Sequence, residues 1–154
     1  WGIIYRHYGA AHRLWQARQL ADIANRRGLA LLISADPGLA IKVGAAGVHW
    51  PFSQKDKARK WQGRFDLMSV SAHGHGELRQ IDAHIFDAAL VSAVFPSKSP
   101  SAGSPLGAFA LRSLSKHSPV PLYGLGGVNS HNASSICNAA GLAAIEGIRD
   151  PFRS

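Results

Sequence analysis

The sequence ALLISADPGLAIKVGAAGVHW at Ala30–Trp50 contains two short apolar runs, Ala30–Ser34 and Gly47–Trp50, and each predicts a buried β-strand. Strands that are apolar throughout are typical of a parallel sheet that is covered by helices. The chain is therefore predicted to be an α/β protein. Five similar runs lie elsewhere, at Gly2–Tyr5, Leu67–Ser71, Asp87–Ser92, Pro121–Gly124 and Leu142–Glu146.

Patterns of helical period separate these strands. The clearest is Ala11–Arg27, which has one apolar face and is followed by Gly28 in the position of a C-terminal cap. A second helix is predicted from Asn129 or Ser130, either of which is a good N-cap, to Ala140. The apolar face of the first helix consists of Leu14, Ala17, Leu20, Ala21 and Ala24. Weaker helical patterns fall at Ser53–Trp61, Gly76–Ala83 and Leu106–Lys116.

The number of strands distinguishes between two ways of closing a parallel sheet. Seven strands favour a (β/α)8 TIM barrel without its first βα unit, because an open doubly wound sheet usually needs fewer strands. The doubly wound sheet remains the alternative. The sequence begins at Trp1 rather than Met, which agrees with a missing first unit. We expect one barrel domain over residues 1–154 that is incomplete at its N-terminus.

The composition excludes several classes of protein. Hydrophobic residues make up 46% of the 154 residues and charged residues 17%, so an apolar core can form and intrinsic disorder is excluded. No apolar run approaches the ~20 residues that span a bilayer, and no membrane association is predicted. The single cysteine, Cys137, has no internal disulfide partner, which suits a cytoplasmic protein.

The chain is strongly basic, with 17 Lys and Arg against 9 Asp and Glu and a net charge of +8. Such a charge fits nucleic acid, a membrane surface or small anions as partners. The one dense basic stretch is interpreted as the solvated face of a short helix, and no aromatic residues interleave with it as in nucleic-acid modules. We therefore expect small anionic ligands and no nucleic acid. The stretch consists of Lys55, Lys57, Arg59, Lys60 and Arg64.

Candidate binding residues follow from the barrel, whose sites lie in the loops after the strands. The turn Gly124–Asn129 precedes the last strand and opens a predicted helix, so its backbone amides could bind a phosphate; a simple chain reversal is the alternative. The loop Phe95–Pro105 carries Ser97, Lys98 and Ser99, which could supply hydroxyls and an ammonium to a phosphate or diphosphate. A polar excursion without function is the alternative there.

Histidines also follow several predicted strands. They have no metal-binding spacing such as HExxH, so no metal site is predicted from them. His73 comes directly after the apolar strand Leu67–Ser71 and is our candidate general acid or base, because a neutral imidazole can move a proton in either direction.

Ala30–Trp50 and four later segments are similar to thiamine phosphate synthases and the related thiazole tautomerases, which are phosphate-binding (β/α)8 barrels. The resemblance implies an enzyme of thiamine biosynthesis that couples an aminopyrimidine methyl diphosphate to thiazole phosphate and releases diphosphate. Its implied partners are those two small molecules, and a homodimer is compatible with it. The four later segments are Val70–His73, Asp87–Ser99, Leu125–Asn129 and Gly141–Ile145.

The resemblance also implies roles for individual residues. Arg6 matches the arginine of a Gln-x-Arg-x-Lys motif that contacts diphosphate, although Ile4 and Tyr8 replace its other two residues. Ser97 and Ser99 match a Thr-x-Thr pair that holds the anion. The phosphate of the thiazole is implied to bind at Gly126, Gly127, Ile145 and Glu146, with Glu146 in place of a small hydroxyl residue.

The metal ligands of the family are not matched in this sequence. An Asn-Asp-Arg-like triplet becomes Ser34–Ala35–Asp36, with the carboxylate one residue late, and a second aspartate falls near Gln54. We therefore expect Mg²⁺ only if the synthase activity is retained. The alternatives are a tautomerase that uses His73 and needs neither metal nor diphosphate, or a phosphate-binding barrel without catalysis.

Overall fold

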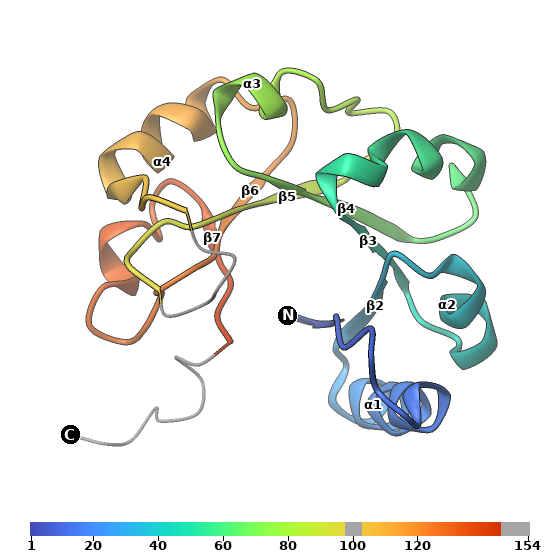
Figure 1. The fold of residues 1–154 in the computed structure, drawn as a ribbon. Helices are drawn as coiled ribbons and strands as arrows, with labels where there is room; N and C mark the ends of the chain where they lie inside the picture. The colour runs from blue at the N-terminus through green and yellow to red at the C-terminus, as the bar shows by residue number, and fades with distance from the viewer. Residues whose placement is uncertain (98–102, 146–154) are drawn as a thin grey trace. The chain divides into compact units, whose positions relative to one another are not determined.

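The computed structural model describes residues 1–97 and 103–145 (Figure 1). These residues belong to two compact units, an N-terminal unit of residues 1–70 and a C-terminal unit that begins at Ser71. The strands follow one another in the order β1-β2-β3-β4-β5-β6-β7. Each described ladder between neighbouring strands is parallel.

The N-terminal unit contains β1 (Gly2–Tyr5), β2 (Ala30–Ser34), β3 (Gly47–Trp50) and most of β4 (Leu67–Ala72). Pairing in register places Ile33 beside Val48, and Val48 beside Met68. The side chains of Ile33 and Val48 are completely buried, and Met68 is almost so. The predicted apolar strands are confirmed, because burial on both faces favours such continuous runs.

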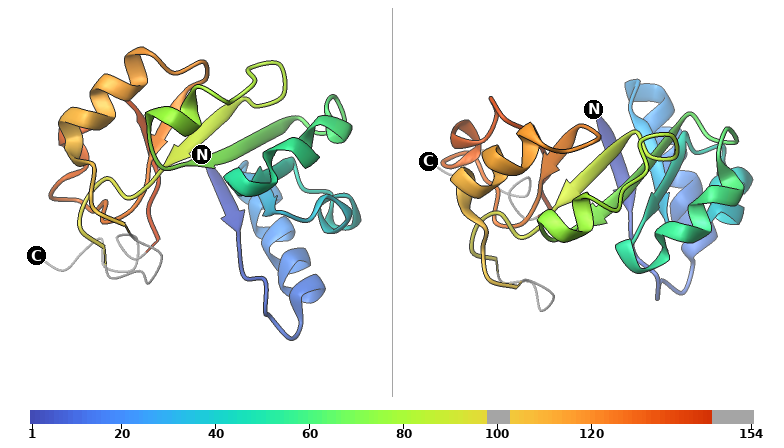
Figure 2. Two further views of the ribbon diagram at one scale, coloured as in Figure 1. Left: turned by 45° about the horizontal axis from the view of Figure 1, so that its top comes forward. Right: turned by 90° about the horizontal axis from the view of Figure 1, so that it is seen from above.

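Three helical elements of the N-terminal unit lie on one face of its strands: α1 (Arg13–Arg27), α2 (Pro37–Val43) and the 3₁₀ helix η1 (Phe52–Trp61) (Figures 1 and 2). Helix α1 packs against β2 and α2. It ends at Gly28 (φ 62°), so the predicted cap is confirmed. The buried face of α1 is narrower than the predicted apolar face: Ala17, Ala21 and Ala24 are buried, whereas Leu14 is 40% exposed.

The C-terminal unit contains three short strands, β5 (Ala88–Val91), β6 (Leu122–Gly124) and β7 (Gly141–Leu142). The N–H of Ser92, just after β5, donates to the carbonyl of Ala72 at the end of β4. Leu111 is buried against the Cα of Gly124, where a Cβ would lie only 2.9 Å from the leucine. The helical elements of this unit are α3 (His75–Leu78), α4 (Gly107–Lys116) and the 3₁₀ helix η2 (Ala133–Ser135).

Two predictions for the last part of the chain are wrong. The helix predicted up to Ala140 is replaced by turns around η2, although Asn129 Oδ1 accepts from the N–H groups of His131 and Asn132 as the predicted N-cap would. The segment is rich in Asn and Ser, which are weak helix formers. The strand predicted at Leu142–Glu146 is the two-residue β7, which begins one residue earlier; Glu146 lies outside the described residues.

The strand order decides between the two predicted closures. A doubly wound sheet reverses its strand order at a switch point, with later strands on the other side of the first. Here each strand follows its predecessor, as in a TIM barrel, so the doubly wound alternative is wrong. Within residues 1–97 and 103–145, no helix is both long and apolar enough to cross a membrane.

Candidate functional site

A row of three buried polar side chains crosses the N-terminal unit near the carboxyl ends of its strands. Ser34, His49 and Ser69 are paired in register on β2, β3 and β4, so their side chains share one face of the sheet. All three are at most 5% exposed. His49 Nδ1 and Ser69 Oγ share a hydrogen bond of 2.9 Å. We call these residues the polar row.

Arg6, the residue just after β1, extends this row. It follows Tyr5, which pairs with Ile33, and therefore lies at the level of Ser34. Burial lowers the pKa of His49 to about 4, and the positive charge of Arg6 contributes to this lowering. The imidazole of His49 is consequently neutral at pH 7. The exposed Arg6 thus lies at the end of the sheet where the sequence predicts an anion site.

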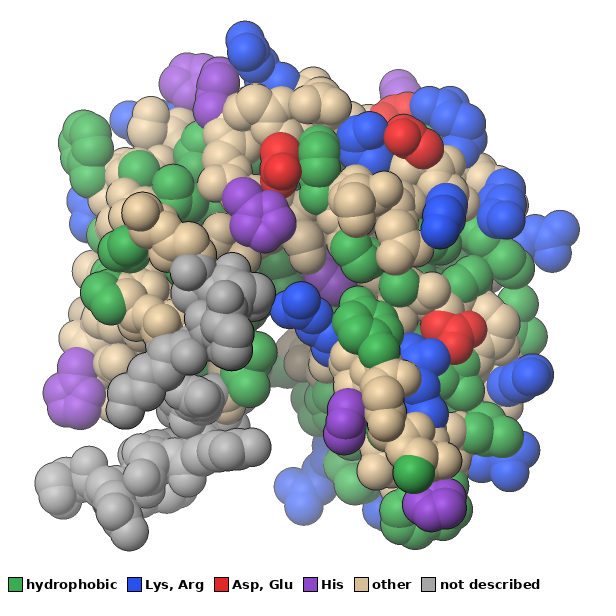
Figure 3. Space-filling view, viewed as in Figure 1, with side chains coloured by type: hydrophobic (Ala, Val, Ile, Leu, Met, Phe, Trp, Pro, Cys, Tyr) green, Lys and Arg blue, Asp and Glu red, His purple; other side chains and the backbone are tan. Residues whose placement is uncertain are grey.

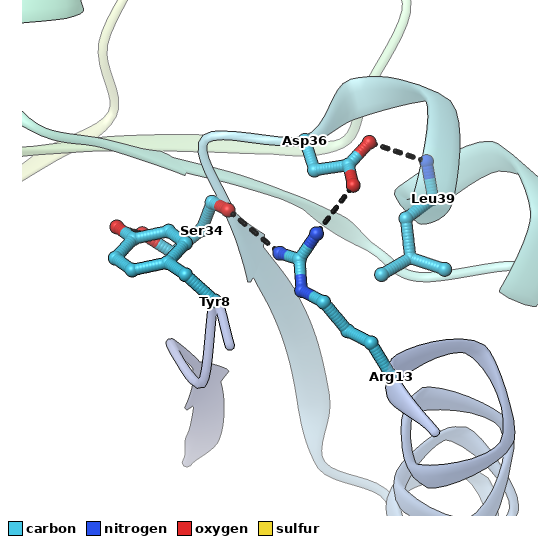
Figure 4. Close-up of polar contacts among 5 residues, drawn as sticks. All are labelled: Tyr8, Arg13, Ser34, Asp36 and Leu39. Carbon is cyan, nitrogen blue, oxygen red and sulfur yellow. Dashed lines mark hydrogen bonds and ion pairs between the residues drawn. The ribbon is translucent and has the colours of Figure 1, made fainter. Parts of the chain in front are cut away.

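A second cluster surrounds Asp36 at the start of α2 (Figure 4). Asp36 Oδ1 accepts from the N–H of Leu39 at 2.9 Å, which caps the helix, and Oδ2 accepts from Arg13 Nη1. Arg13 Nη2 also donates to the carbonyl of Ser34 at 3.2 Å. The hydroxyl groups of Tyr8 and Ser34 lie 2.7 Å apart in a hydrogen bond. Neither Arg13 nor its pairing with Asp36 was predicted, because 23 residues separate the two.

In the C-terminal unit, two glycines form the turn that the sequence singles out. Gly126 (φ 92°) and Gly127 (φ 65°) are in backbone conformations that L side chains rarely adopt. A Cβ at Gly126 would lie 2.9 Å from Ala93, and one at Gly127 would overlap the carbonyl oxygen of Pro96. The turn therefore requires glycine at both positions. Within the described residues the N–H groups of Gly126 and Gly127 have no protein acceptor.

The carbonyl of Gly127 accepts from two asparagines, of which the sequence analysis singles out only Asn129, as an N-cap. Asn132 Nδ2 donates to it at 2.8 Å and Asn129 Nδ2 at 3.4 Å. The presence of two asparagines close together after the glycines could have predicted these bonds, since asparagine side chains often bond to nearby backbone groups in turns. Because no helix follows, the expected contribution of a helix N-terminus to the anion site is wrong. The backbone N–H groups of the two glycines remain the candidate anion-binding groups.

The loop after β5 packs directly on this turn. The N–H of Val94 donates to Leu125 and that of Phe95 to Gly126, both at 2.9 Å. Phe95 and Pro96 lie against Gly127, and Ser97, the next residue, is partly buried. Two candidate regions of the sequence are thus adjacent within the unit. Lys98, Ser99 and Glu146 lie outside the described residues, and Ile145 is 66% exposed.

His73 lies directly after β4 and is exposed. Glu77 Oε2 accepts from the N–H of His73 at 2.8 Å and shares a hydrogen bond of 3.0 Å with its Nδ1. A carboxylate on Nδ1 orients the ring and leaves Nε2 as the nitrogen for proton exchange. No described contact joins His73 to Gly126 or Gly127.

The dense basic stretch of the sequence lies on and just after η1. Figure 3, in the view of Figure 1, shows Lys and Arg side chains gathered on that side, with acidic side chains among them. Lys57, Arg59 and Lys60 are exposed, and Lys55 pairs with Asp56 at 3.1 Å. This arrangement is a solvated helix face, as the sequence predicts, although the helix is of the 3₁₀ type.

The family model described as "Thiamine monophosphate synthase" matches residues 3–148. This chain belongs to that family. The thiamine-phosphate synthase of Chloroflexus aurantiacus is 29% identical over 150 residues, which covers 93% of the chain and 68% of the relative. That of Marinobacter nauticus is 31% identical and covers 93% and 67%.

Solved structures agree with the fold of this thiamine monophosphate synthase family member. The thiamine phosphate pyrophosphorylase from Pyrococcus furiosus has a TM-score of 0.76 at 17% identity, which covers 97% of the chain and 76% of that structure. The family resemblance and the TIM-barrel class predicted from the sequence are confirmed, and the relatives support a thiamine phosphate synthase function. The chain spans about two thirds of the length of these two curated relatives.

Proposed function

We propose that this chain carries the phosphate-binding part of a thiamine phosphate synthase of thiamine biosynthesis. In this reaction the nitrogen of thiazole phosphate bonds to the methylene carbon of an aminopyrimidine methyl diphosphate, and the carbon–oxygen bond to diphosphate breaks. Both substrates are small phosphorylated molecules, which fits a chain with a net charge of +8. The family and the named relatives support this assignment.

The observation that carries the proposal is the backbone of Gly126 and Gly127. A phosphate is commonly bound by backbone N–H groups in a glycine turn, because no side chain keeps the anion away. Both glycines are required by the packing on Ala93 and Pro96, and their N–H groups lack acceptors within the described residues. We propose this turn, together with Ser97, Lys98, Ser99, Ile145 and Glu146, as the site of the thiazole phosphate.

The diphosphate is proposed to bind at the carboxyl end of the N-terminal unit. Arg6 supplies a positive charge there. The buried imidazole of His49 is neutral and therefore needs no carboxylate as a partner, and a carboxylate would repel the departing anion. Departing diphosphate carries negative charge that fixed donors stabilise. The residues that the family uses for Mg²⁺ do not fit that ion here. Asp36 already accepts from two protein donors, and no group of three His, Cys, Asp or Glu ligands occurs in the described residues.

A binding experiment tests the glycine turn. Isothermal titration of thiazole phosphate into wild type and Gly127→Asp should show a loss of affinity of at least about tenfold, because the new side chain displaces the amides and adds negative charge. Gly63→Asp is the matched control, since Gly63 also has a positive φ (72°) but open space around it. Equal affinities of wild type and Gly127→Asp would contradict the proposed site.

A second candidate function is a thiazole tautomerase, and the contact of His73 with Glu77 favours it. A ring oriented on its Nδ1 side is suited to move a proton at Nε2. One assay with both substrates distinguishes the synthase from the tautomerase activity. Diphosphate release from the two substrates supports the synthase, whereas double-bond migration that disappears in His73→Ala supports the tautomerase. Binding without either reaction would indicate a phosphate-binding barrel without catalysis.

The remaining partners of this function stay predictions. We propose a cytoplasmic location, since a lone cysteine suits a reducing compartment. Oligonucleotide affinity that falls steeply with salt would contradict the expectation of no nucleic-acid partner. Light scattering would test for a homodimer.

A further inference from the structure

Ala35 stands where the family resemblance places a metal-binding carboxylate, and the next residue, Asp36, forms an internal ion pair. Both carboxylate oxygens of Asp36 accept hydrogen bonds from this chain, one from the backbone of Leu39 and one from the guanidinium of Arg13. The first bond is the N-cap of α2 and the second is an ion pair. Both oxygens therefore already have protein donors.

The guanidinium of Arg13 is held from several sides (Figure 4). It donates to Asp36 and to the carbonyl of Ser34, and its carbon lies 5.9 Å from the ring centre of Tyr5 and 5.8 Å from that of Tyr8. Its side chain is 20% exposed and extends from the first residue of α1. Such contacts keep an arginine in one orientation, so it occupies the position as a fixed charge.

Both oxygen atoms of Ser34 are also in use. The hydroxyl of Ser34 bonds to Tyr8, and its carbonyl accepts from Arg13. Ala35 has no side-chain oxygen. The amide oxygen of Gln54, where the second aspartate is expected, accepts from Lys57 at 3.2 Å. Mg²⁺ needs near-octahedral oxygen ligands that include carboxylates, and these positions offer no free carboxylate.

The charge around Asp36 opposes a divalent cation as well. A hollow of about 280 Å³ beside the ion pair is lined by Arg13, Asp36 and Lys42, so two cations face one carboxylate. A third positive centre would meet like-charge repulsion there. We propose that the Arg13 guanidinium takes the place of a divalent cation beside Asp36, and that this end of the sheet binds an anion without a metal ion. The identity of the anion, a diphosphate, rests on the proposed function.

Titration with Mn²⁺ alone, followed by electron paramagnetic resonance, tests the metal half directly. Wild type and Asp36→Asn should bind Mn²⁺ equally weakly. Arg13→Met frees one oxygen of Asp36 and should raise the Mn²⁺ affinity at least about tenfold, a gain that Arg13→Met/Asp36→Asn should lose. Arg18→Met, an exposed position on the same helix, is the matched control and should leave Mn²⁺ binding unchanged.

The outcome that overturns the proposal is tight Mn²⁺ binding by wild type that Asp36→Asn abolishes. This comparison does not depend on the folding of Arg13→Met. Calorimetry with inorganic pyrophosphate in the presence of EDTA tests the anion half. Saturable binding that Arg6→Gln weakens at least about tenfold supports it, and binding that occurs only after Mn²⁺ is added overturns it. If pyrophosphate binds under neither condition, the proposed diphosphate site fails, while the Mn²⁺ titration still decides the metal substitution.

Discussion

Among single residues, His49 has the most unusual environment. The sequence shows a histidine at a strand end, but its buried position between Ser34 and Ser69 arises only when β2, β3 and β4 pair in register. Burial and the charge of Arg6 then disfavour its protonated form and lower its pKa. The neutral imidazole keeps its hydrogen bond to Ser69 without adding a buried charge.

This environment predicts a pH-dependent stability. The pKa of His49 is about 4 in the folded chain and 6.5 in the unfolded chain, so the unfolded state binds more protons between these values. The free energy of unfolding should therefore fall as the pH drops through this window, by about 3 kcal/mol in all. Urea unfolding across the window should show a weaker pH dependence in His49→Gln than in wild type. The same slope in both proteins would contradict this assignment.

At the scale of the elements, helix α2 shows why two glycines near one short helix are not equivalent. Gly44 ends the helix with φ 64°, and a Cβ there would have no neighbour within 4 Å, so its constraint is purely conformational. Gly38 lies inside the helix, where a Cβ would be 3.6 Å from Asp36, an ordinary contact. The first position favours glycine and the second does not.

Alanine at these two positions should have opposite effects. Gly44→Ala is expected to lower the free energy of unfolding by about 1 kcal/mol, because an L residue is strained in the left-handed region. Gly38→Ala should raise it by about 0.5 kcal/mol, since alanine restricts the unfolded chain. Thermal or urea unfolding measures both changes. A destabilised Gly38→Ala beside an unchanged Gly44→Ala would contradict the assignment of the helix end.

At the scale of the whole molecule, the sequence predicts a single domain, whereas the structure divides into two compact units. Strand β4 is continuous across the boundary, since Val70 ends one unit and Ser71 begins the other. Unfolding of either unit alone would therefore interrupt this strand. We expect the two units to unfold together.

The tryptophans make this expectation measurable. All four, Trp1, Trp15, Trp50 and Trp61, are in the N-terminal unit, and Trp50 is the largest of the fully buried side chains in the described residues. Their fluorescence reports on that unit alone, while far-ultraviolet circular dichroism reports on both. The two signals should give coincident urea transitions, as expected of one cooperative domain. Separate midpoints would indicate two independently folding units.

Local pattern was sufficient for most of the strands and for part of the site. The apolar runs at Ala30–Ser34 and Gly47–Trp50 match β2 and β3 residue for residue, because burial on both faces leaves a continuous signal. Pattern was misleading between Asn129 and Ala140. The apolar residues there have helical spacing, but the segment is rich in Asn and Ser, which favour turns over helix interiors.

The amino-acid sequence by itself determined the order of the strands, helix α1 with its glycine cap, and the family. These properties depend on burial period and on backbone conformations that neighbouring residues set. Only the tertiary structure decided that Arg13 neutralises Asp36 and that His49 lies in a buried polar row. Such pairings join residues that are distant in the chain, and they form only when packed strands and helices bring opposite charges and polar groups within hydrogen-bond distance.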